Sequence, residues 1–164
     1  DQWTAAAKYT LLLLMIIGAC AGSTGGALKV VRILLILKSG YRELLHVMHP
    51  KAVIPLKLGG LPVRDEVLRP SNIFVGMYMI IFALATLLLA IISYGQPGMD
   101  VEAVISAVAT TLGNVGPGFG MVGPAFSFAE VQPAGKMLLF FCMWMGRLEI
   151  ITALVLLVPE FWKK

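Results

Sequence analysis

The stretch GACAGSTGGA, residues 18–27, interrupts an apolar run that extends from about residue 4 to residue 38. As one straight helix this run would be roughly 50 Å long, whereas the hydrocarbon core of a bilayer is about 30 Å thick. The stretch contains four glycines, and each weakens a helix by about 1 kcal/mol relative to alanine. We therefore expect a transmembrane helix that is broken by an irregular loop within the membrane.

The same glycines have a second interpretation. Small residues allow helices in a membrane to pack closely, which accounts for the glycines but not for the excess length of the segment. A nucleotide-binding loop is excluded, because the stretch has no lysine for a phosphate-binding P-loop and does not match the spacing of a dinucleotide fingerprint. Close packing of helices therefore remains an alternative explanation of these glycines.

The composition indicates an integral membrane protein. Of 164 residues, 59% are hydrophobic and only 13% are charged, whereas a soluble domain of this size exposes far more charge. The net charge of +4 does not indicate a nucleic-acid partner, because the basic residues cluster on one side of the predicted spans. The chain has no initiator methionine, so we expect the C-terminal part of a longer polypeptide, or a processed product.

Two more spans are predicted, with a short helix between them. NIFVGMYMIIFALATLLLAIIS, residues 72–93, carries no charge and is long enough to cross a bilayer, and a third span covers residues 136–158. The helix that starts after Asp100 has about 13 residues, roughly 20 Å, before the glycines of GNVGPGFG end it. Asp100 is expected to cap this helix and Glu102 to complement its positive end. This helix of about 13 residues is too short to cross a bilayer.

Charge asymmetry sets the predicted topology. Residues 39–70 and the C-terminus carry several basic residues, whereas no Lys or Arg follows the second span before Lys136. The positive-inside rule places residues 39–70 and the C-terminus in the cytoplasm. The short helix within residues 95–135 then enters from outside and is re-entrant. In the cytoplasmic segment, VIPLKLGGLPV predicts a hairpin that turns at Gly59 and Gly60.

The peptide after the short helix is a candidate cation site. The partly negative end of a re-entrant helix points towards the membrane centre, and irregular backbone at that depth must face protein or water. A ring of carbonyl oxygens can replace the hydration shell of a cation. The predicted ion-binding carbonyls are those of Gly113, Asn114, Val115 and Gly116. Alternatively, residues 101–112 form an interfacial helix followed by an external loop.

A charge inside the third span supports an aqueous path. Arg147 falls near the bilayer centre, where insertion costs about 2.5–3.5 kcal/mol, and Glu149 is not placed to pair with it on the same helix. Arg147 therefore faces protein or water, either as a gating charge or as a structural residue bound to helix-end carbonyls. The residues predicted to form the gate are Gly18, Gly22, Ser23, Thr24, Gly25, Gly26 and Arg147.

Four stretches together resemble one family. GACAGSTGGALKVVR, HPKAVIPLKLGG, GNVGPGFG and GRLEIITALVLLVPEFW match, in order, the end of a bacterial Trk-type membrane subunit of the Trk/Ktr/HKT superfamily of potassium transporters. The resemblance implies an all-α membrane protein with a broken transmembrane helix and one helix–re-entrant pore loop–helix repeat. Residues 1–48 would be the last helix of a third repeat, with the intramembrane loop at 18–27. Residues 49–70 would be a cytoplasmic connector and residues 71–164 the fourth repeat.

The resemblance also implies a function and partners. The function would be potassium uptake across the inner membrane by a multi-pass protein that is not an enzyme. Gly116 would be a filter glycine. The bound species would be a potassium ion, with no organic cofactor. The partners would be the membrane, a second copy of the full-length subunit and a cytoplasmic nucleotide-binding regulatory subunit. One departure is Ala27, where the family usually has glycine. A non-conducting membrane scaffold and a sodium-permeable relative remain alternatives.

Overall fold

The computed structural model describes residues 3–20, 22–23, 25–50, 55–63, 65–148, 150, 152 and 155. Its helices are α1 (Ala5–Ile17), α2 (Val30–Met48), α3 (Asp65–Ile92), α4 (Val101–Gly113) and α5 (Pro133–Arg147). Two short strands, β1 (Lys57–Leu58) and β2 (Leu61–Pro62), and two 3-10 turns, η1 (Gly120–Val122) and η2 (Phe128–Glu130), complete the described elements. The fold is mostly helical, as predicted.

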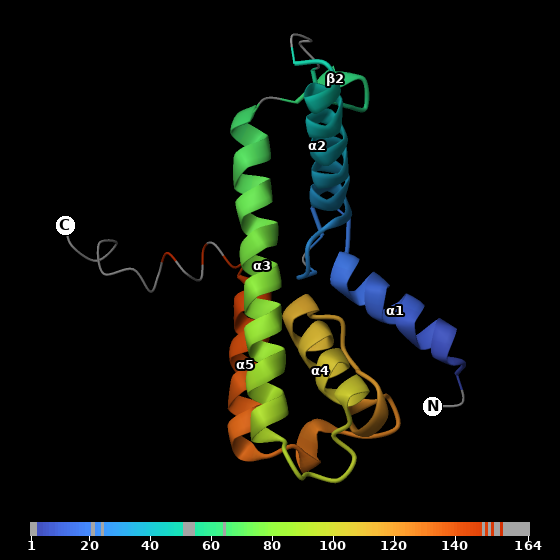
Figure 1. Cartoon of the computed structure of the whole chain (residues 1–164). Coiled ribbons are helices and arrows are strands. Elements are labelled where there is room, and N and C mark those ends of the chain that lie inside the picture. The colour runs from blue at the N-terminus through green and yellow to red at the C-terminus, as the bar shows by residue number, and fades with distance from the viewer. Residues whose placement is uncertain are drawn as a thin grey trace, which may run out of the picture.

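Helix α3 is the longest element, and the others are arranged along it (Figure 1). Helix α2 lies beside its upper half, and α4 and α5 lie beside its lower half. Residues Val67–Ile92 form the one helix in the described part of the chain that is long and apolar enough to cross a bilayer. Only 17% of its most apolar window is buried, so these side chains face outward rather than into the core of a soluble domain. The helix begins at Asp65, earlier than the predicted start at residue 72.

The long apolar N-terminal run forms two helices instead of one. Helix α1 ends at Gly18, which has φ +75, and α2 begins after Lys29. Helix ends leave backbone carbonyls without partners. Here the amide of Leu28 donates to the carbonyl of Ile16 (3.4 Å), and the amide of Val30 donates to that of Ala19 (3.1 Å). The segment between the two helices thus folds back onto the end of α1.

Helix α4 is buried on almost every side. It contacts α1, α3 and α5, and ten of its 13 residues are buried. It starts at the lower end of α3 and ends beside the middle of that helix (Figure 1). A helix that lies flat on a membrane surface keeps a polar face in water, and α4 has no such face. This burial argues against the interfacial alternative.

The two acidic residues at the start of α4 behave differently from each other. Asp100 occupies the N-cap position, as predicted, but its carboxylate makes no capping hydrogen bond, so the predicted capping role is wrong. Glu102 lies in the first turn and pairs with Lys8 of α1 at 3.1 Å. The Glu102 carboxylate lies at the N-terminal end of α4, where the helix dipole favours a negative charge.

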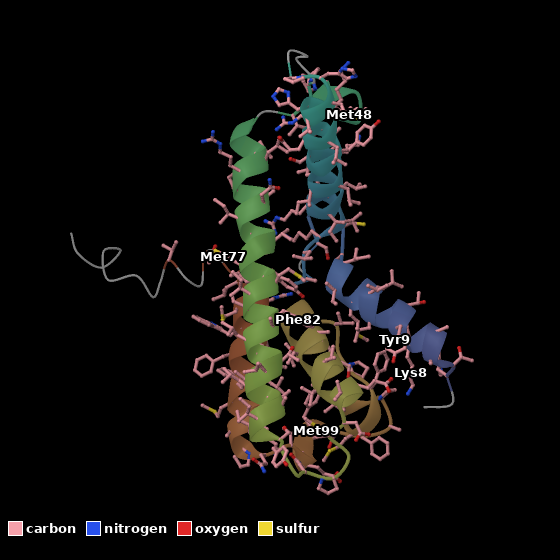
Figure 2. All side chains as sticks on the ribbon, viewed as in Figure 1. Lys8, Tyr9, Met48, Met77, Phe82 and Met99 are labelled. Atoms are coloured by element: carbon pink, nitrogen blue, oxygen red, sulfur yellow. The ribbon has the colours of Figure 1, made fainter. Side chains whose placement is uncertain are left out.

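The hydrophobic core lies between α3, α4 and α5. Figure 2 labels Met99 of this core, and Met77 and Phe82, which pack against it. Its largest fully buried side chains include Tyr78 and Leu89 of α3 and Leu112 of α4. Helix α5 begins at Pro133, slightly before the predicted third span of residues 136–158. Most of that span beyond residue 148, with Glu149 and the C-terminus, lies outside the described residues.

The predicted hairpin is confirmed. Strands β1 and β2 are antiparallel, and Gly59 and Gly60 adopt φ +58 and +86, the left-handed values that a two-residue hairpin turn requires. Lys38 of α2 donates to the Lys57 carbonyl at 2.7 Å. A second small core fixes the hairpin to α2 and α3, and it consists of Leu35, Leu56 and Leu68.

Candidate functional site

The predicted cation-binding segment lies where α4 ends. Asn114 is the C-cap residue and has a left-handed backbone (φ 52, ψ 42), a common way to end a helix. Gly113 is buried, whereas Asn114, Val115 and Gly116 are exposed. Within the described part of the chain, the backbone oxygens of Asn114 and Val115 accept no hydrogen bond. Neither carbonyl is therefore engaged by a described residue.

Two hydroxyls of α4 hold the chain as it returns alongside the helix. The Thr110 hydroxyl accepts from the Gly116 amide at 2.9 Å and donates to the Gly116 carbonyl at 2.5 Å. One turn earlier, the Ser106 hydroxyl accepts from the Phe119 amide at 2.8 Å. One lone pair of the Gly116 carbonyl is thus engaged, in contrast to the carbonyls of Asn114 and Val115. The sequence interpretation missed Thr110 and Ser106, although their four-residue spacing on an apolar helix is a signal.

The glycine-rich segment and the predicted cation-binding segment border the same cavity. This cavity has a volume of about 360 Å³ and opens between the end of α1, the segment after it and the end of α4. These parts lie at the same level, beside the middle of α3 (Figure 1). The lining residues are Leu11, Leu14, Met15, Gly18, Ala19, Gly25, Gly26, Gly113, Asn114 and Val115. Two segments far apart in the sequence thus meet at one site.

Some of the glycines at this site are also required by close packing. A Cβ on Gly26 would lie 2.9 Å from both the Leu112 carbonyl oxygen and the Asn114 side-chain nitrogen. A Cβ on Gly146 of α5 would overlap that same carbonyl oxygen. The Asn114 side chain donates to the Met143 carbonyl at 3.3 Å. The close-packing interpretation therefore holds for Gly26, which lines the cavity as well.

The other predicted gating residues are placed as follows. Gly22 is exposed, has φ +84 and would have open space around a Cβ. The exposed Ser23 hydroxyl accepts from the Gly25 amide at 3.2 Å. Arg147 is the last residue of α5, next to Gly146, and is exposed. Thr24 lies outside the described residues.

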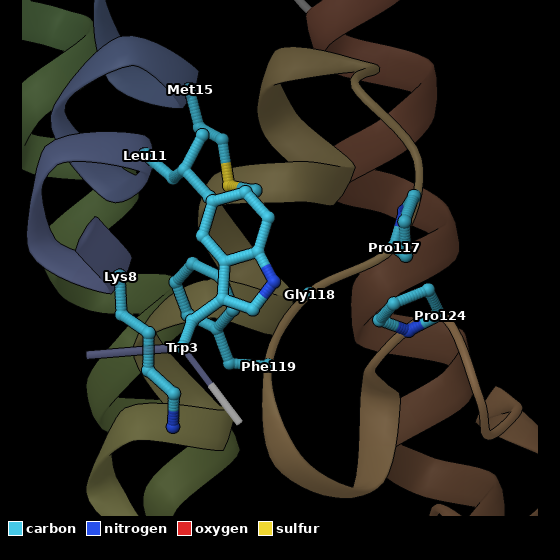
Figure 3. Close-up of a pocket in the computed structure, with 8 residues that line it drawn as sticks. All are labelled: Trp3, Lys8, Leu11, Met15, Pro117, Gly118, Phe119 and Pro124. Carbon is cyan, nitrogen blue, oxygen red and sulfur yellow. The ribbon is translucent and has the colours of Figure 1, made fainter. Parts of the chain in front are cut away.

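A second cavity, of about 200 Å³, continues along α1 towards its start. Figure 3 shows the Trp3 indole between α1 and the returning segment that carries Gly118. Leu11 and Met15 line both cavities, so the two follow one another along the same face of α1. Lys8 lines the second cavity and pairs with Glu102.

The residues that line the larger cavity are glycines, apolar residues and one asparagine. Among the described residues, no group of three or more His, Cys, Asp or Glu side chains is placed to hold a metal ion. Neutral carbonyl oxygens suit a weakly hydrated monovalent cation that must bind and leave quickly.

Comparisons with known proteins show the family of the chain. The sequence model of the TrkH family, described as "Cation transport protein", matches residues 1–164. The Trk system potassium uptake protein TrkH of Salmonella typhimurium is 42% identical over 163 residues, which are 99% of this chain and 32% of that protein. The TrkH protein of Halomonas elongata is 37% identical over 100% of this chain and 33% of its own length.

A solved structure is similar as well. The crystal structure of the potassium transporter TrkH from Vibrio parahaemolyticus superposes with a TM-score of 0.82 at 42% identity, over 98% of this chain and 33% of that one. The chain thus spans about a third of the length of the relatives it matches. Since the family model covers every residue, the chain belongs to the TrkH family of cation transport proteins.

Proposed function

We propose that this chain supplies one filter segment and an intramembrane gating loop to a pore for potassium uptake across the cell membrane. The relatives are named potassium uptake proteins, and the chain spans about a third of their length. The observation that carries the proposal is the cavity shared by Gly25 and Gly26 with Asn114 and Val115. A loop that borders the cation site is well placed to close it.

The filter role rests on the end of α4. Asn114 and Val115 are exposed residues, and their carbonyls accept no hydrogen bond in the described part of the chain. The partial negative charge of the helix C-terminus favours a cation there. Gly113 and Gly116 complete the proposed filter segment. One such segment cannot surround an ion, so further segments of the full-length subunit would close the ring.

The orientation rests on the basic residues. The hairpin end of the molecule carries Lys38, Arg42, Lys57 and Arg69, which would face the cytoplasm under the positive-inside rule. Helix α4 starts at the opposite end of α3 (Figure 1) and would enter from outside as a re-entrant pore helix. Helices α1 and α2 would form the broken transmembrane helix.

The gate role rests on the segment between α1 and α2. Its Gly26 packs against the end of α4 at Leu112 and Asn114, next to the proposed filter. With Gly18, Gly22, Ser23, Thr24, Gly25 and Arg147, it would form the gate. A second copy of the full-length subunit and a cytoplasmic nucleotide-binding subunit remain the proposed partners.

Replacement of a filter glycine tests the proposal. Gly116 has φ +137 and open space around a Cβ, so Gly116→Ser strains the backbone without a clash. Strain of this kind amounts to about 1–3 kcal/mol, and we expect the K⁺ over Na⁺ uptake ratio of the full-length subunit to fall about tenfold. Uptake is measured in a bacterial strain without other potassium transporters.

The chain offers a matched control. Gly22 also has a positive φ and open space around a Cβ, but it lies in the proposed gate. Gly22→Ser should therefore change the rate of uptake and leave the K⁺ over Na⁺ uptake ratio within about twofold of the parent value. An unchanged ratio in the Gly116→Ser variant would remove the filter assignment, and an equal Na⁺ and K⁺ uptake by the parent protein would favour the sodium-permeable alternative.

A further inference from the structure

We infer that Thr110 is a specificity-determining residue, because its hydroxyl fixes the orientation of the filter residue Gly116. This inference rests on the proposed function of the filter segment. Thr110 lies on α4, is only 1% exposed and lines no described cavity. It acts through Gly116 and is therefore a positioning residue.

The hydroxyl makes a closed pair of hydrogen bonds with one residue. It accepts from the amide of Gly116 at 2.9 Å and donates to the carbonyl of the same residue at 2.5 Å. A threonine hydroxyl has one proton to donate, and here that proton is given to the Gly116 carbonyl. The hydroxyl thus sets the direction of both peptide groups that meet at Gly116.

Among the described residues, only the Thr110 hydroxyl forms hydrogen bonds with Gly116. Its φ of +137 is a value that glycine adopts freely, and no heavy atom beyond its neighbours lies within 4 Å of an added Cβ. Without the hydroxyl, the two peptide groups at this position could rotate. The carbonyl of Gly116 and that of Val115, which belongs to the preceding peptide, would then lose their fixed directions.

Ser106 supports the same segment from one turn earlier. Its hydroxyl accepts from the Phe119 amide at 2.8 Å, and a Cβ on Gly118 would lie 2.9 Å from that hydroxyl. Two hydroxyls of α4 thus hold the returning chain, at Gly116 and at Phe119, in addition to the backbone bond from the Val115 amide to the Thr110 carbonyl (3.0 Å). Of the two hydroxyls, only that of Thr110 bonds to a residue of the proposed filter.

Thr111 provides a control within the same helix. It is also buried, but its hydroxyl donates to the carbonyl of Ala107 at 2.7 Å, inside α4. Thr111→Val therefore removes a buried hydroxyl of the same kind without touching the filter. Thr110→Val removes both bonds to Gly116, whereas Thr110→Ser keeps the hydroxyl.

The test measures the K⁺ over Na⁺ uptake ratio of the full-length subunit, with uptake normalised to the amount of protein in the membrane. Thr110→Val should lower the ratio about five- to tenfold, because it removes both hydrogen bonds that hold Gly116. Thr110→Ser and Thr111→Val should stay within about twofold of the parent. A Thr110→Val protein with the parent ratio, or an equal loss in Thr111→Val, would overturn the inference.

Two further measurements keep the test decisive. Should Thr110→Val not accumulate in the membrane, Thr110→Cys, which retains a weak donor, is measured instead. An intermediate ratio supports the inference and a parent ratio overturns it. If the parent protein takes up no K⁺ in preference to Na⁺, the proposed function fails, whereas a selective parent with an unaffected Thr110→Val variant contradicts only the role of Thr110.

Discussion

At the scale of the residue, Ala27 is one of three non-glycine positions with a positive φ in the described part of the chain. It has φ +62 and is buried, although a left-handed conformation costs an L-residue about 1–2 kcal/mol. A Cβ added to Gly18 would overlap the Ala27 methyl group, and a Cβ added to Gly113 would lie 3.7 Å from it. A glycine would avoid the strain. We therefore expect Ala27 to stiffen the end of the proposed gating loop that precedes α2.

Ala27→Gly should raise the stability of the protein. The relief of the left-handed strain is expected to add about 1 kcal/mol to the free energy of unfolding. Thermal unfolding of the purified full-length subunit in detergent measures this change. Ala19 lies in the same segment but has no positive φ, so Ala19→Gly should lower the stability. A lower melting temperature for Ala27→Gly would contradict the account of Ala27.

At the scale of the element, the crossing of α4 and α5 fixes the site. Gly146 brings the α5 backbone against the Leu112 carbonyl, and Asn114 bonds to Met143 on the same helix. Arg147 follows directly, so the proposed gating charge is carried by the helix that holds the base of the filter. Any shift of α5 at this point would move the end of α4.

Gly146→Ala should destabilise the protein, because the new methyl group would overlap backbone that cannot move aside. Overpacking of this kind costs about 1–3 kcal/mol. Gly76 of α3 has no heavy atom within 4 Å of an added Cβ, and Gly76→Ala should stabilise the helix by about 0.5–1 kcal/mol. Chemical or thermal unfolding of both variants is the measurement. Equal stability of the two would show that α4 and α5 do not meet at Gly146.

The elements were largely predictable from sequence. Hydrophobic length and glycine position indicated α4, its end at Asn114 and the separation of α1 from α2, and the glycine pair indicated the hairpin. The start of α3 was not predicted, because polar residues before Pro70 resemble a loop. Thr110, Ser106 and Gly146 were missed for a different reason. Their role depends on which backbone groups they approach, and a single sequence does not show contacts across the fold.

At the scale of the whole molecule, the elements divide into two levels. Helix α3 extends over the full height, whereas α4 and α5 end beside its middle, where α1 and α2 also meet (Figure 1). The cavity of about 360 Å³ lies at this level, and the cavity of about 200 Å³ leads towards the start of α1. The chain spans about a third of the length of its relatives, so the proposed pore would be completed by other segments.

The central claim is that the segment after α4 faces a water-filled path that opens to the outside. Val115 is 49% exposed and lines the cavity, so Val115→Cys places a reporter there in a full-length subunit from which Cys20 and Cys142 have been removed. Leu84→Cys, on the exposed apolar side of α3, is the control and should not react.

The decisive measurement is the rate at which a membrane-impermeant thiol reagent, applied from outside, labels Val115→Cys with and without K⁺. We predict labelling that K⁺ slows and that an equal concentration of a large organic cation does not. Absence of labelling from outside, or a rate that K⁺ leaves unchanged, would contradict the account.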